Sequence, residues 1–408
     1  MRVGIVTTWF ERGAAYVSRQ YREVLNNWDG PTVTWAKKVP SLVPTKVDLE
    51  DFQQWLIHNR IQIVFFNEQW WWPAIILARK LKVITGAYID YYTQQTIEFF
   101  ALYDFLICNT RKHFSAFSWH PGVTYIPWGT DLTTFQPIEN SSAHPQVVTF
   151  FHSGGISPQR KGCDLVLRAF HALRGDSKLV IHAQQRLRAV FPNLVDVIDE
   201  LVAAGRLEIH ERTVSAPGLF HMGDVYVYPT RLEGIGLTIL EAAACGLPVI
   251  ATDYGPMNEF VKHGDNGRVV EVERLVARPD GYYWPQAFVS LQSLVEQMQW
   301  YVDNVHLLPQ LKARARYVAE RDFDWRLSAD GVLAAFSSAD IREVAGYGRI
   351  EREIMQFERT QEALYRIDNA DYLKRRIQID YPTIYKFLTR ISGLLKGRVQ
   401  ASSNSKPA

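Results

Sequence analysis

Short apolar runs alternate with longer helical patterns over the first 135 residues. Four runs have the length of strands: 2–8, 61–66, 81–86 and 104–108. Between them, apolar residues recur with helical spacing at 14–26 and 74–81. Continuous apolar runs of this length are typical of strands buried on both faces. Strands that alternate with helices predict a parallel, doubly wound sheet.

A second series of the same kind follows. Its strand candidates are residues 147–153, 178–183, 206–210, 224–228 and 247–251. The clearest helical patterns are 160–175 and 236–246, and each ends at a glycine, a usual helix stop. The stretch 126–145, rich in Pro, Gly, Ser and Thr, predicts a linker between the two halves. Two such sheets would place their ligand-binding strand ends at a shared cleft.

The last part of the chain, 339–408, is charged and helical in pattern. Residues 372–408 hold eight Lys or Arg and one acid. One helical face would carry Ile384, Phe387, Leu388, Ile391, Leu394 and Leu395. Such a basic amphipathic tail can lie on an anionic membrane surface. It can equally pack back on the body of the protein or form an oligomer contact.

Composition narrows the class of protein. The 408 residues are 47% hydrophobic and 22% charged, as in soluble globular proteins of two or three domains. No run of eighteen apolar residues predicts a membrane span, and the opening residues lack the pattern of a signal peptide. A net charge of +2 argues against a nucleic-acid binder. Three widely spaced cysteines favour a reducing, cytoplasmic setting. Twelve tryptophans exceed what the cores need and suggest a surface that binds sugars.

The stretch 224–270 carries the clearest chemistry. A strand ends near Pro229, a loop then holds Glu233, Gly234 and Gly236, and a helix begins near Leu237. Glycines before a helix let backbone N–H groups approach a phosphate, and the helix dipole favours its charge. Glu241, one turn into the helix, would lean back toward the ligand and suits a ribose diol. A tight strand–helix turn with no ligand is the alternative interpretation.

Glu233 and Glu241, separated by seven residues, match the Glu-x7-Glu motif, and the chain resembles the retaining glycosyltransferases of family four. Further phrases are similar to that family: IPWGTDLTTFQP at 126–137, SGGISPQRKGCDLVLRAF at 153–170 and RDFDWRLSADGVLAAF at 321–336. The resemblance spans roughly residues 1–338. It implies the α/β GT-B fold, with two facing Rossmann-like doubly wound parallel-sheet domains. These would be an acceptor-binding domain at 1–135 and a nucleotide-sugar domain at 136–338, with a helical extension at 339–408.

The resemblance also implies roles for particular residues. Glu233 would contact the donor sugar, and Glu241 would bind the ribose. Lys161 would neutralise the diphosphate leaving group. Gly13, in the first loop, would approach the same phosphates. The backbone amides that hold sugar hydroxyls and the distal phosphate would be those of Gly234, Ile235, Gly236 and Leu237.

Two departures from the family pattern leave alternatives open. The family usually has an Arg near the start of the phosphate loop, where this chain has Gly155. Arg160 either replaces it or points to solvent. The family often has a His after its fourth strand, where this chain has Asp90. Asp90 either binds a sugar hydroxyl as part of the catalytic site or caps a helix N-terminus.

The predicted acceptor site follows the second apolar run, at the C-terminal end of a strand. There the sequence NEQWWWP, 67–73, offers Trp70 and Trp71 for stacking on sugar rings and Glu68 for acceptor hydroxyls. Tyr91, in the aromatic run 87–92, is a further candidate. The alternative is that these tryptophans pack under a loop or against a partner.

The resemblance implies a retaining, metal-independent hexosyltransferase. It would move a hexose from a nucleotide diphosphate sugar to a glycan or lipid-linked acceptor, without a cofactor. The expected setting is the cytoplasm, with the tail at the inner face of the membrane and the reaction serving surface polysaccharide or glycolipid synthesis. A nucleotide-sugar epimerase, and an inactive relative that binds glycans or acts as a scaffold, are the alternatives.

Overall fold

The computed structural model describes residues 1–7, 13–26, 33–38, 47–68, 71–137, 147–361 and 384. Its contacts divide the chain into two compact units. Unit 1 contains Met1–Ile89, Glu98–Leu106 and the chain from Phe336 onward, and unit 2 contains Asp90–Ile97 and Ile107–Ala335. Of the apolar face predicted for the tail, Ile384 alone falls within the described residues, and the rest of 362–408 lies outside them. The domain boundaries inferred from the sequence stay predictions.

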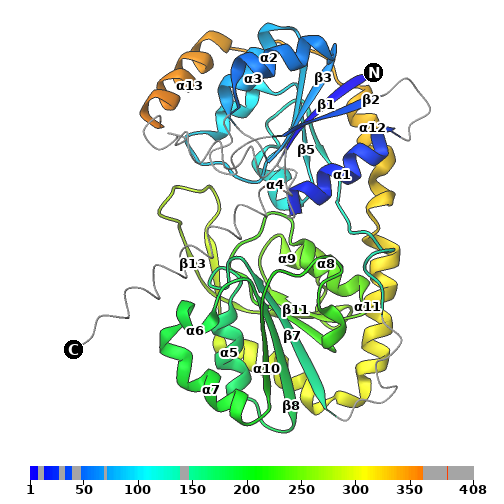
Figure 1. The fold of residues 1–408 in the computed structure, drawn as a ribbon, viewed down its shortest axis with the longest axis vertical. Helices are drawn as coiled ribbons and strands as arrows, with labels where there is room; N and C mark the ends of the chain where they lie inside the picture. The colour runs from blue at the N-terminus through cyan, green and yellow to red at the C-terminus, as the bar shows by residue number, and fades with distance from the viewer. Residues whose placement is uncertain are drawn as a thin grey trace. The chain divides into compact units, whose positions relative to one another are not determined.

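The first sheet has the strand order β2-β1-β3-β4-β5-β6 (Figure 1). Neighbouring strands from β2 to β5 run parallel. The strands are β1 (Arg2–Thr7), β2 (Val33–Lys38), β3 (Ile63–Asn67), β4 (Ile84–Tyr88), β5 (Phe105–Cys108) and β6 (Val123–Tyr125). The helices of this part are α1 (Gly13–Asn26), α2 (Leu49–His58), α3 (Trp72–Lys80), η1 (Ile97–Leu102) and α4 (Arg111–Ala116). The four predicted strands and both predicted helices are therefore confirmed.

The second sheet has the order β12-β11-β10-β7-β8-β9, and all its pairs are parallel. Its strands are β7 (Val148–Gly155), β8 (Ser177–Ala183), β9 (Leu207–Glu211), β10 (Val225–Tyr228), β11 (Val249–Thr252) and β12 (Gly267–Val270). A separate antiparallel hairpin, β13 (Val272–Val276) and β14 (Gln286–Val289), follows. Residues of β10 and β11 are all buried, as expected of central parallel strands.

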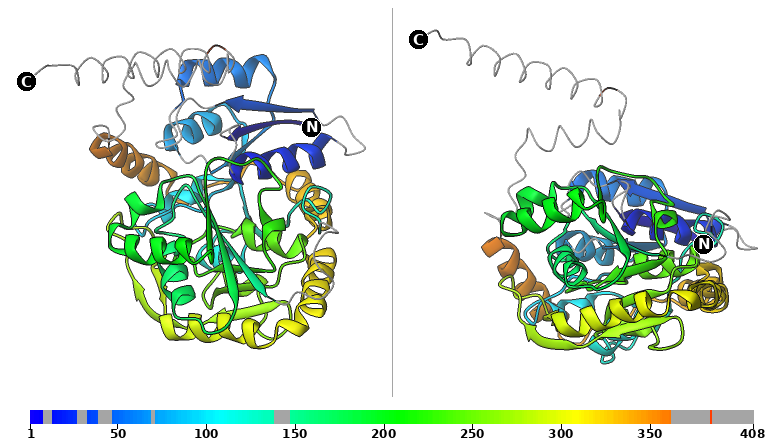
Figure 2. Two further views of the ribbon diagram at one scale, coloured as in Figure 1. Left: turned by 60° about the horizontal axis from the view of Figure 1, so that its bottom comes forward. Right: turned by 90° about the horizontal axis from the view of Figure 1, so that it is seen from below.

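Helices cover both faces of the second sheet (Figure 2). α5 (Cys163–His171), α7 (Val195–Ala203) and α10 (Leu291–Asp303) share one apolar core with β7 and β8. From β10 onward, strands are added in the opposite direction along the sheet. A right-handed crossover therefore places α8 (Leu237–Ala244) on the opposite face of the sheet. There α8 packs on α11 (Leu308–Asp322). Shorter helices are α6 (Leu187–Val190), η2 (Pro192–Leu194), η3 (Phe220–Met222), α9 (Met257–Phe260), η4 (Val305–Leu307) and η5 (Trp325–Ser328).

The stretch predicted as a linker is packed in its described part. Trp128 is 1% exposed and stacks on Trp325, with ring centroids 6.3 Å apart. The backbone N–H of Thr130 donates to the carbonyl of Phe323 over 2.7 Å. The phrases around 128 and 325, which carry part of the family resemblance, therefore form one contact within unit 2.

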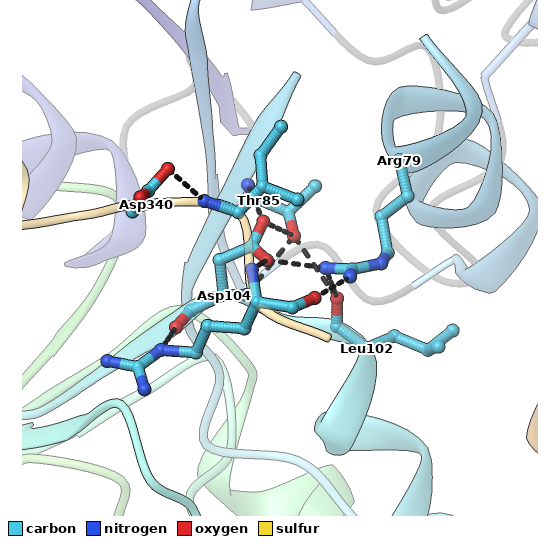
Figure 3. Close-up of polar contacts among 7 residues, drawn as sticks. Arg79, Thr85, Leu102, Asp104 and Asp340 are labelled. Atoms are coloured by element: carbon cyan, nitrogen blue, oxygen red, sulfur yellow. Dashed lines mark hydrogen bonds and ion pairs between the residues drawn. The ribbon is translucent and has the colours of Figure 1, made fainter. Parts of the chain in front are cut away.

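Asp104 ties the returning chain to unit 1 (Figure 3). Its buried carboxylate accepts hydrogen bonds from Arg79 Nη1 at 2.6 Å, from the backbone N–H of Thr85 at 2.7 Å and from that of Arg342 at 2.8 Å. Arg79 comes from α3 and Thr85 from β4, whereas Arg342 lies between α12 (Ala329–Ser337) and α13 (Tyr347–Gln361). One side chain thus connects three segments that are distant in sequence. α13 then packs beside α3.

Candidate active site

The second sheet has a topological switch point between β7 and β10. From β7 the chain moves outward through β8 and β9, and from β10 it moves the other way through β11 and β12. Ligands of open parallel sheets bind at such a point, beyond the carboxyl ends of the strands. The loops that leave these two ends, 155–162 and 229–236, carry most of the donor-site residues predicted from the sequence.

Glycines allow these loops to approach their neighbours closely. Gly162 and Gly236 are the N-caps of α5 and α8 and have φ angles of 81° and 87°, which L-residues with a side chain rarely adopt. A Cβ on Gly234 would lie 2.1 Å from Asp90 Oδ2. No side chain caps α8, so the amides at its start remain oriented for an anion. Of the neighbouring residues, Ile235 is buried and Leu237 half-buried.

Glu233 is held by three donors at one of its oxygens. Oε1 accepts from Arg160 Nη1 at 2.6 Å, from the hydroxyl of Tyr228 at 2.6 Å and from that of Thr230 at 2.8 Å. Burial raises the pKa of Glu233, but the Arg160 and Lys161 cations and the two hydroxyls together hold it below its usual value. No hydrogen bond from the described part of the chain reaches Oε2. Glu233 is therefore an anchored carboxylate with one oxygen left for a ligand.

Arg160 points to Glu233 and not to solvent. Its Nη1 also donates to the carbonyl of Leu232, and the Glu233 carboxylate raises the pKa of the guanidinium. A second arginine, Arg231, pairs with Asp164 at 2.7 Å and donates to the carbonyl of Gln159, which joins the two loops. The loop after β7 therefore offers a fixed cation to the loop after β10. Its contact with a ligand stays a prediction.

Lys161 lies beside the same carboxylate. Its Nζ is 5.2 Å from the centroid of the Tyr228 ring, and a Cβ on Gly155 would lie 3.7 Å from it. Burial lowers the pKa of Lys161, while the charges of Glu233 and Glu241 raise it. The Lys161 ammonium group therefore lies against the backbone of Gly155, whose φ of 50° is one that residues with a side chain rarely adopt. Two cations and two carboxylates share this strand-end site.

Glu241 has a strongly shifted pKa. Burial raises it from 4.5 to about 7, and Lys161 opposes the shift. The folded protein therefore holds a proton at Glu241 between pH 4.5 and 7 that the unfolded chain has released. The contribution of this group to the free energy of unfolding is largest below pH 4.5 and is lost as the pH rises toward 7.

Replacement of Glu241 by glutamine should therefore stabilise the ligand-free protein at pH 8, by about 1–3 kcal/mol. The same change should weaken binding of the nucleotide ribose. Urea unfolding at pH 4.5 and pH 8 measures the first effect, and Glu320→Gln, on the exposed side of α11, serves as the control. A variant whose stability changes equally at both pH values would contradict this assignment.

Asp90 lies against the Gly234 loop within unit 2. Its carboxylate is the group that a side chain at Gly234 would meet, and its backbone carbonyl accepts from the Tyr282 hydroxyl at 2.6 Å. The next helix begins only at Ile97, so Asp90 caps none. Tyr91 stacks on Tyr282, with centroids 5.4 Å apart, and its hydroxyl donates to Asp280 at 3.4 Å. Asp90 therefore belongs to the surroundings of the Glu233 loop.

The remaining predicted residues lie in unit 1. Gly13 is the first residue of α1, and Glu68 follows β3 with a φ of 55°. Trp70 lies outside the described residues. Trp71 is half-buried, and its indole Nε1 donates to Glu358 of α13 at 3.2 Å. Their convergence on the donor site stays a prediction.

The idea that the tryptophan-rich run forms a sugar-binding surface needs correction at Trp72. That side chain is 1% exposed and packs edge-on against Phe99 and Phe100. Trp128 and Trp325 are buried as well. A notable share of the tryptophans therefore builds cores. His152, near the end of β7, is fully buried, and its ring nitrogens form hydrogen bonds with the carbonyl of Val227 and with Cys163 Sγ.

Sequence reasoning missed the contribution of α4. Glu259 accepts the backbone N–H groups of Arg111 and Lys112, at 2.7 and 2.9 Å, and so fixes the start of this helix. Burial lowers the pKa of Lys112 to about 8, although the charges of Glu233, Glu259 and Asp90 raise it. Its Nζ lies over the rings of Tyr254 and Trp284. The sequence around α4 carries no motif that signals a role.

The described ranges show neither a metal-binding cluster nor a membrane-spanning helix. In those ranges, no cluster of three or more His, Cys, Asp or Glu side chains is arranged to bind a metal ion. None of the helices there combines the length and apolarity that crossing a membrane requires.

Comparisons with known proteins match the part of the chain that carries these loops. Residues 147–278, which include both loops, match the family described as glycosyl transferases group 1. The chain is 28% identical over 273 residues to a D-inositol 3-phosphate glycosyltransferase of Rhodococcus jostii, covering 61% of this chain and 55% of the relative. It is 32% identical over 182 residues to a GDP-mannose-dependent monoacylated alpha-(1-6)-phosphatidylinositol monomannoside mannosyltransferase of Corynebacterium glutamicum, covering 40% and 46%.

The chain spans about half the length of these curated relatives. Among solved structures, it resembles HepE of Anabaena in complex with UDP and glucose. The TM-score is 0.63 at 15% identity, and the match covers 83% of this chain and 100% of HepE. The two parallel-sheet α/β units, with a helical C-terminal part, have the GT-B fold predicted from the sequence.

Proposed function

We propose that this chain is a retaining, metal-independent glycosyltransferase of the family-four type. It transfers a hexose from a nucleotide diphosphate sugar to a glycan or lipid-linked acceptor, in surface polysaccharide or glycolipid synthesis. The observation that carries the proposal is the switch-point site. There Glu233 is anchored by Arg160, with Lys161 beside it and the uncapped start of α8 next in the chain.

In this proposal the donor binds across the two loops. The amides from Gly234 to Leu237 hold sugar hydroxyls and the distal phosphate, and Glu241 holds the ribose. Oε2 of Glu233 contacts the sugar near its anomeric carbon. A carboxylate fixed before the reaction stabilises positive charge that develops at that carbon without having to reorganise.

Arg160 and Lys161 then serve the leaving group. As the bond between the anomeric carbon and the phosphate oxygen breaks, negative charge grows on the diphosphate. The acceptor hydroxyl oxygen bonds to the anomeric carbon on the same face, and its proton passes to a diphosphate oxygen. Cations in a buried site interact with such charge far more strongly than they would in water.

The acceptor is proposed to contact Glu68, Trp70, Trp71 and Tyr91, with aromatic rings against its apolar sugar faces. The names of the relatives support phosphorylated or lipid-linked polyols as acceptors, because one acts on D-inositol 3-phosphate and another on a phosphatidylinositol mannoside. A cytoplasmic setting, with the tail at the inner face of the membrane, completes the proposal. Flotation with anionic liposomes, compared with a chain ending at Gln361 that keeps α13, tests that contact.

A thermal-shift screen with UDP-, GDP- and ADP-sugars tests donor binding. The donor that stabilises the protein is then incubated with inositol phosphates and glycolipid acceptors. Proton NMR of the product reports whether the anomeric configuration of the donor is retained. An inverted product would remove the retaining mechanism, and no transfer from any bound donor would favour a glycan-binding or scaffold protein.

Metal independence makes a separate prediction. Transfer should change less than about two-fold after treatment with EDTA, because the Arg160 and Lys161 cations supply the charge that a divalent ion provides elsewhere. The assay compares initial rates with EDTA, without it, and with added Mg²⁺ or Mn²⁺. Loss of transfer on chelation, restored by one of these ions, would contradict the prediction.

A further inference from the structure

A buried histidine and a buried cysteine meet close to where the two donor-site loops begin. His152 Nδ1 lies 2.7 Å from the carbonyl oxygen of Val227, and His152 Nε2 lies 2.9 Å from Cys163 Sγ. Neither His152 nor Cys163 is exposed to solvent. His152 belongs to β7, Val227 to β10, and Cys163 is the first residue of α5, all within unit 2. One imidazole ring therefore connects three elements around the switch point of the second sheet.

The His152 side chain extends the connection between β7 and β10 beyond their backbone pairing. Among the described residues, the last pair of these two strands joins Phe151 to Tyr226. One residue further along each strand, the His152 ring binds the carbonyl of Val227. The two donor-site loops leave the same strand ends shortly afterwards. The ring thus holds the strands together at the edge of the sheet where these loops start.

The protons of this pair follow from what each group can donate. A backbone carbonyl can only accept, so His152 must carry a proton on Nδ1 to form its hydrogen bond with Val227. Burial lowers the pKa of His152 to about 4, so the ring is neutral at physiological pH and Nε2 carries no proton. Burial also raises the pKa of the Cys163 thiol, which keeps its proton and donates it to Nε2. The two hydrogen bonds therefore run from Cys163 through His152 to Val227.

Cys163 also closes the loop that carries the two cations of the site. Its backbone N–H donates to the carbonyl of Pro158 at 3.0 Å. A Cβ on Gly154 would overlap Cys163 Sγ, so the thiol lies directly against the backbone of β7. Arg160 and Lys161 lie between Pro158 and Cys163 in the sequence and therefore within this closed turn. A displacement of Cys163 would be transmitted to both cations.

We propose that His152 and Cys163 are positioning residues for the cations that serve the leaving group. Their hydrogen bond fixes the loop of Arg160 and Lys161 to the end of β10, from which the Glu233 loop departs. This inference rests on the proposed function, in which the two cations bind the diphosphate. The chemistry required of residue 163 is one hydrogen-bond donor at the position of Sγ.

Two variants of Cys163 separate this role from simple packing. Cys163→Ser keeps a donor at this position, whereas Cys163→Ala removes it. We expect Cys163→Ala to lower kcat, and to weaken nucleotide diphosphate binding, by about five-fold or more, the scale of one lost hydrogen bond. Cys163→Ser should change both by less than about two-fold, and the KM for the acceptor should stay constant in both variants. Calorimetry with UDP, GDP and ADP measures the binding, and equal losses in the two variants would overturn the proposal.

Cys108→Ala is the matched control for the loss of a buried thiol. Cys108 is also free and buried, in β5, and in the described part of the chain its sulfur forms no hydrogen bond. This variant should leave kcat and diphosphate binding within about two-fold of the unmodified protein. Thermal unfolding of all three variants monitors the fold. A loss in Cys108→Ala as large as that in Cys163→Ala would attribute the effect to packing and overturn the proposal.

A measurement that needs no activity tests the hydrogen bonds directly. In ¹⁵N-histidine-labelled protein, the His152 signals, assigned by their loss in His152→Gln, should show a proton on Nδ1 and stay constant from about pH 6 to 9, above the pKa of the ring. The Nε2 signal should shift in Cys163→Ala and less in Cys163→Ser. A proton on Nε2, or an Nε2 signal that does not respond to Cys163→Ala, would overturn the proposal. Absence of transfer with every donor would overturn the proposed function instead, and the two failures are therefore distinguishable.

Discussion

Substitution of Glu233 by glutamine is expected to lower the rate of sugar transfer by about 10²–10³-fold, the usual effect of removing one preorganised electrostatic group. Glutamine can still accept the hydrogen bonds of Tyr228 and Thr230, so the geometry of the loop is largely kept. The negative charge is lost, however, and Arg160 and Lys161 then have no carboxylate at 233 beside them. At the position of Oε2, the oxygen proposed to face the anomeric carbon, glutamine places an uncharged amide NH2 group.

The decisive measurement is kcat with saturating donor and acceptor. Nucleotide diphosphate binding, measured by calorimetry, should change only a few-fold, because the amides at the start of α8 and the two cations remain. Glu320→Gln is the matched control, since Glu320 also pairs with an arginine, at 2.7 Å, but is 54% exposed on α11. Unchanged kcat in Glu233→Gln would exclude Glu233 from catalysis. A chain that binds sugars equally well with either residue and transfers none would be a lectin-like relative.

The strands and the donor loops could be predicted because their signals are local. A buried parallel strand needs an unbroken apolar run, and a helix start that faces a ligand needs glycine. Both requirements are visible in a few consecutive residues, as at 224–237. Strand β2 was not predicted, because its sequence VTWAKK lacks a continuous apolar run.

The rest of the site depends on contacts between distant segments. Glu259 and the start of α4 meet only after the chain has folded, and no spacing along the sequence links them. The same holds for Asp90, whose position over Gly234 explains why residue 234 has no side chain. Trp72 shows the opposite error: a run of aromatic residues at a strand end suggested a surface, although a buried helix start needs the same residue types.

Asp104 is the residue whose loss is expected to destabilise unit 1 most. Its carboxylate is fully buried and accepts from Arg79, Thr85 and Arg342 (Figure 3). Replacement by alanine leaves the buried Arg79 guanidinium with backbone carbonyls but no carboxylate, and it removes the acceptor of the Thr85 and Arg342 N–H groups. Breaking a buried ion pair in this way typically costs about 3–5 kcal/mol. We therefore expect Asp104→Ala to lower the free energy of unfolding by that amount.

Urea unfolding followed by circular dichroism measures the loss. Asp340→Ala is the control, because this nearby aspartate is exposed and, among the described residues, accepts only from the backbone N–H of Ile341, at 2.7 Å. It should cost less than about 1 kcal/mol. The double variant Arg79→Met with Asp104→Ala should be less destabilised than the sum of the two single variants, since no buried guanidinium is then left without its carboxylate. If the two losses simply add, Arg79 and Asp104 are not coupled, and the ion pair does not explain the cost of losing Asp104.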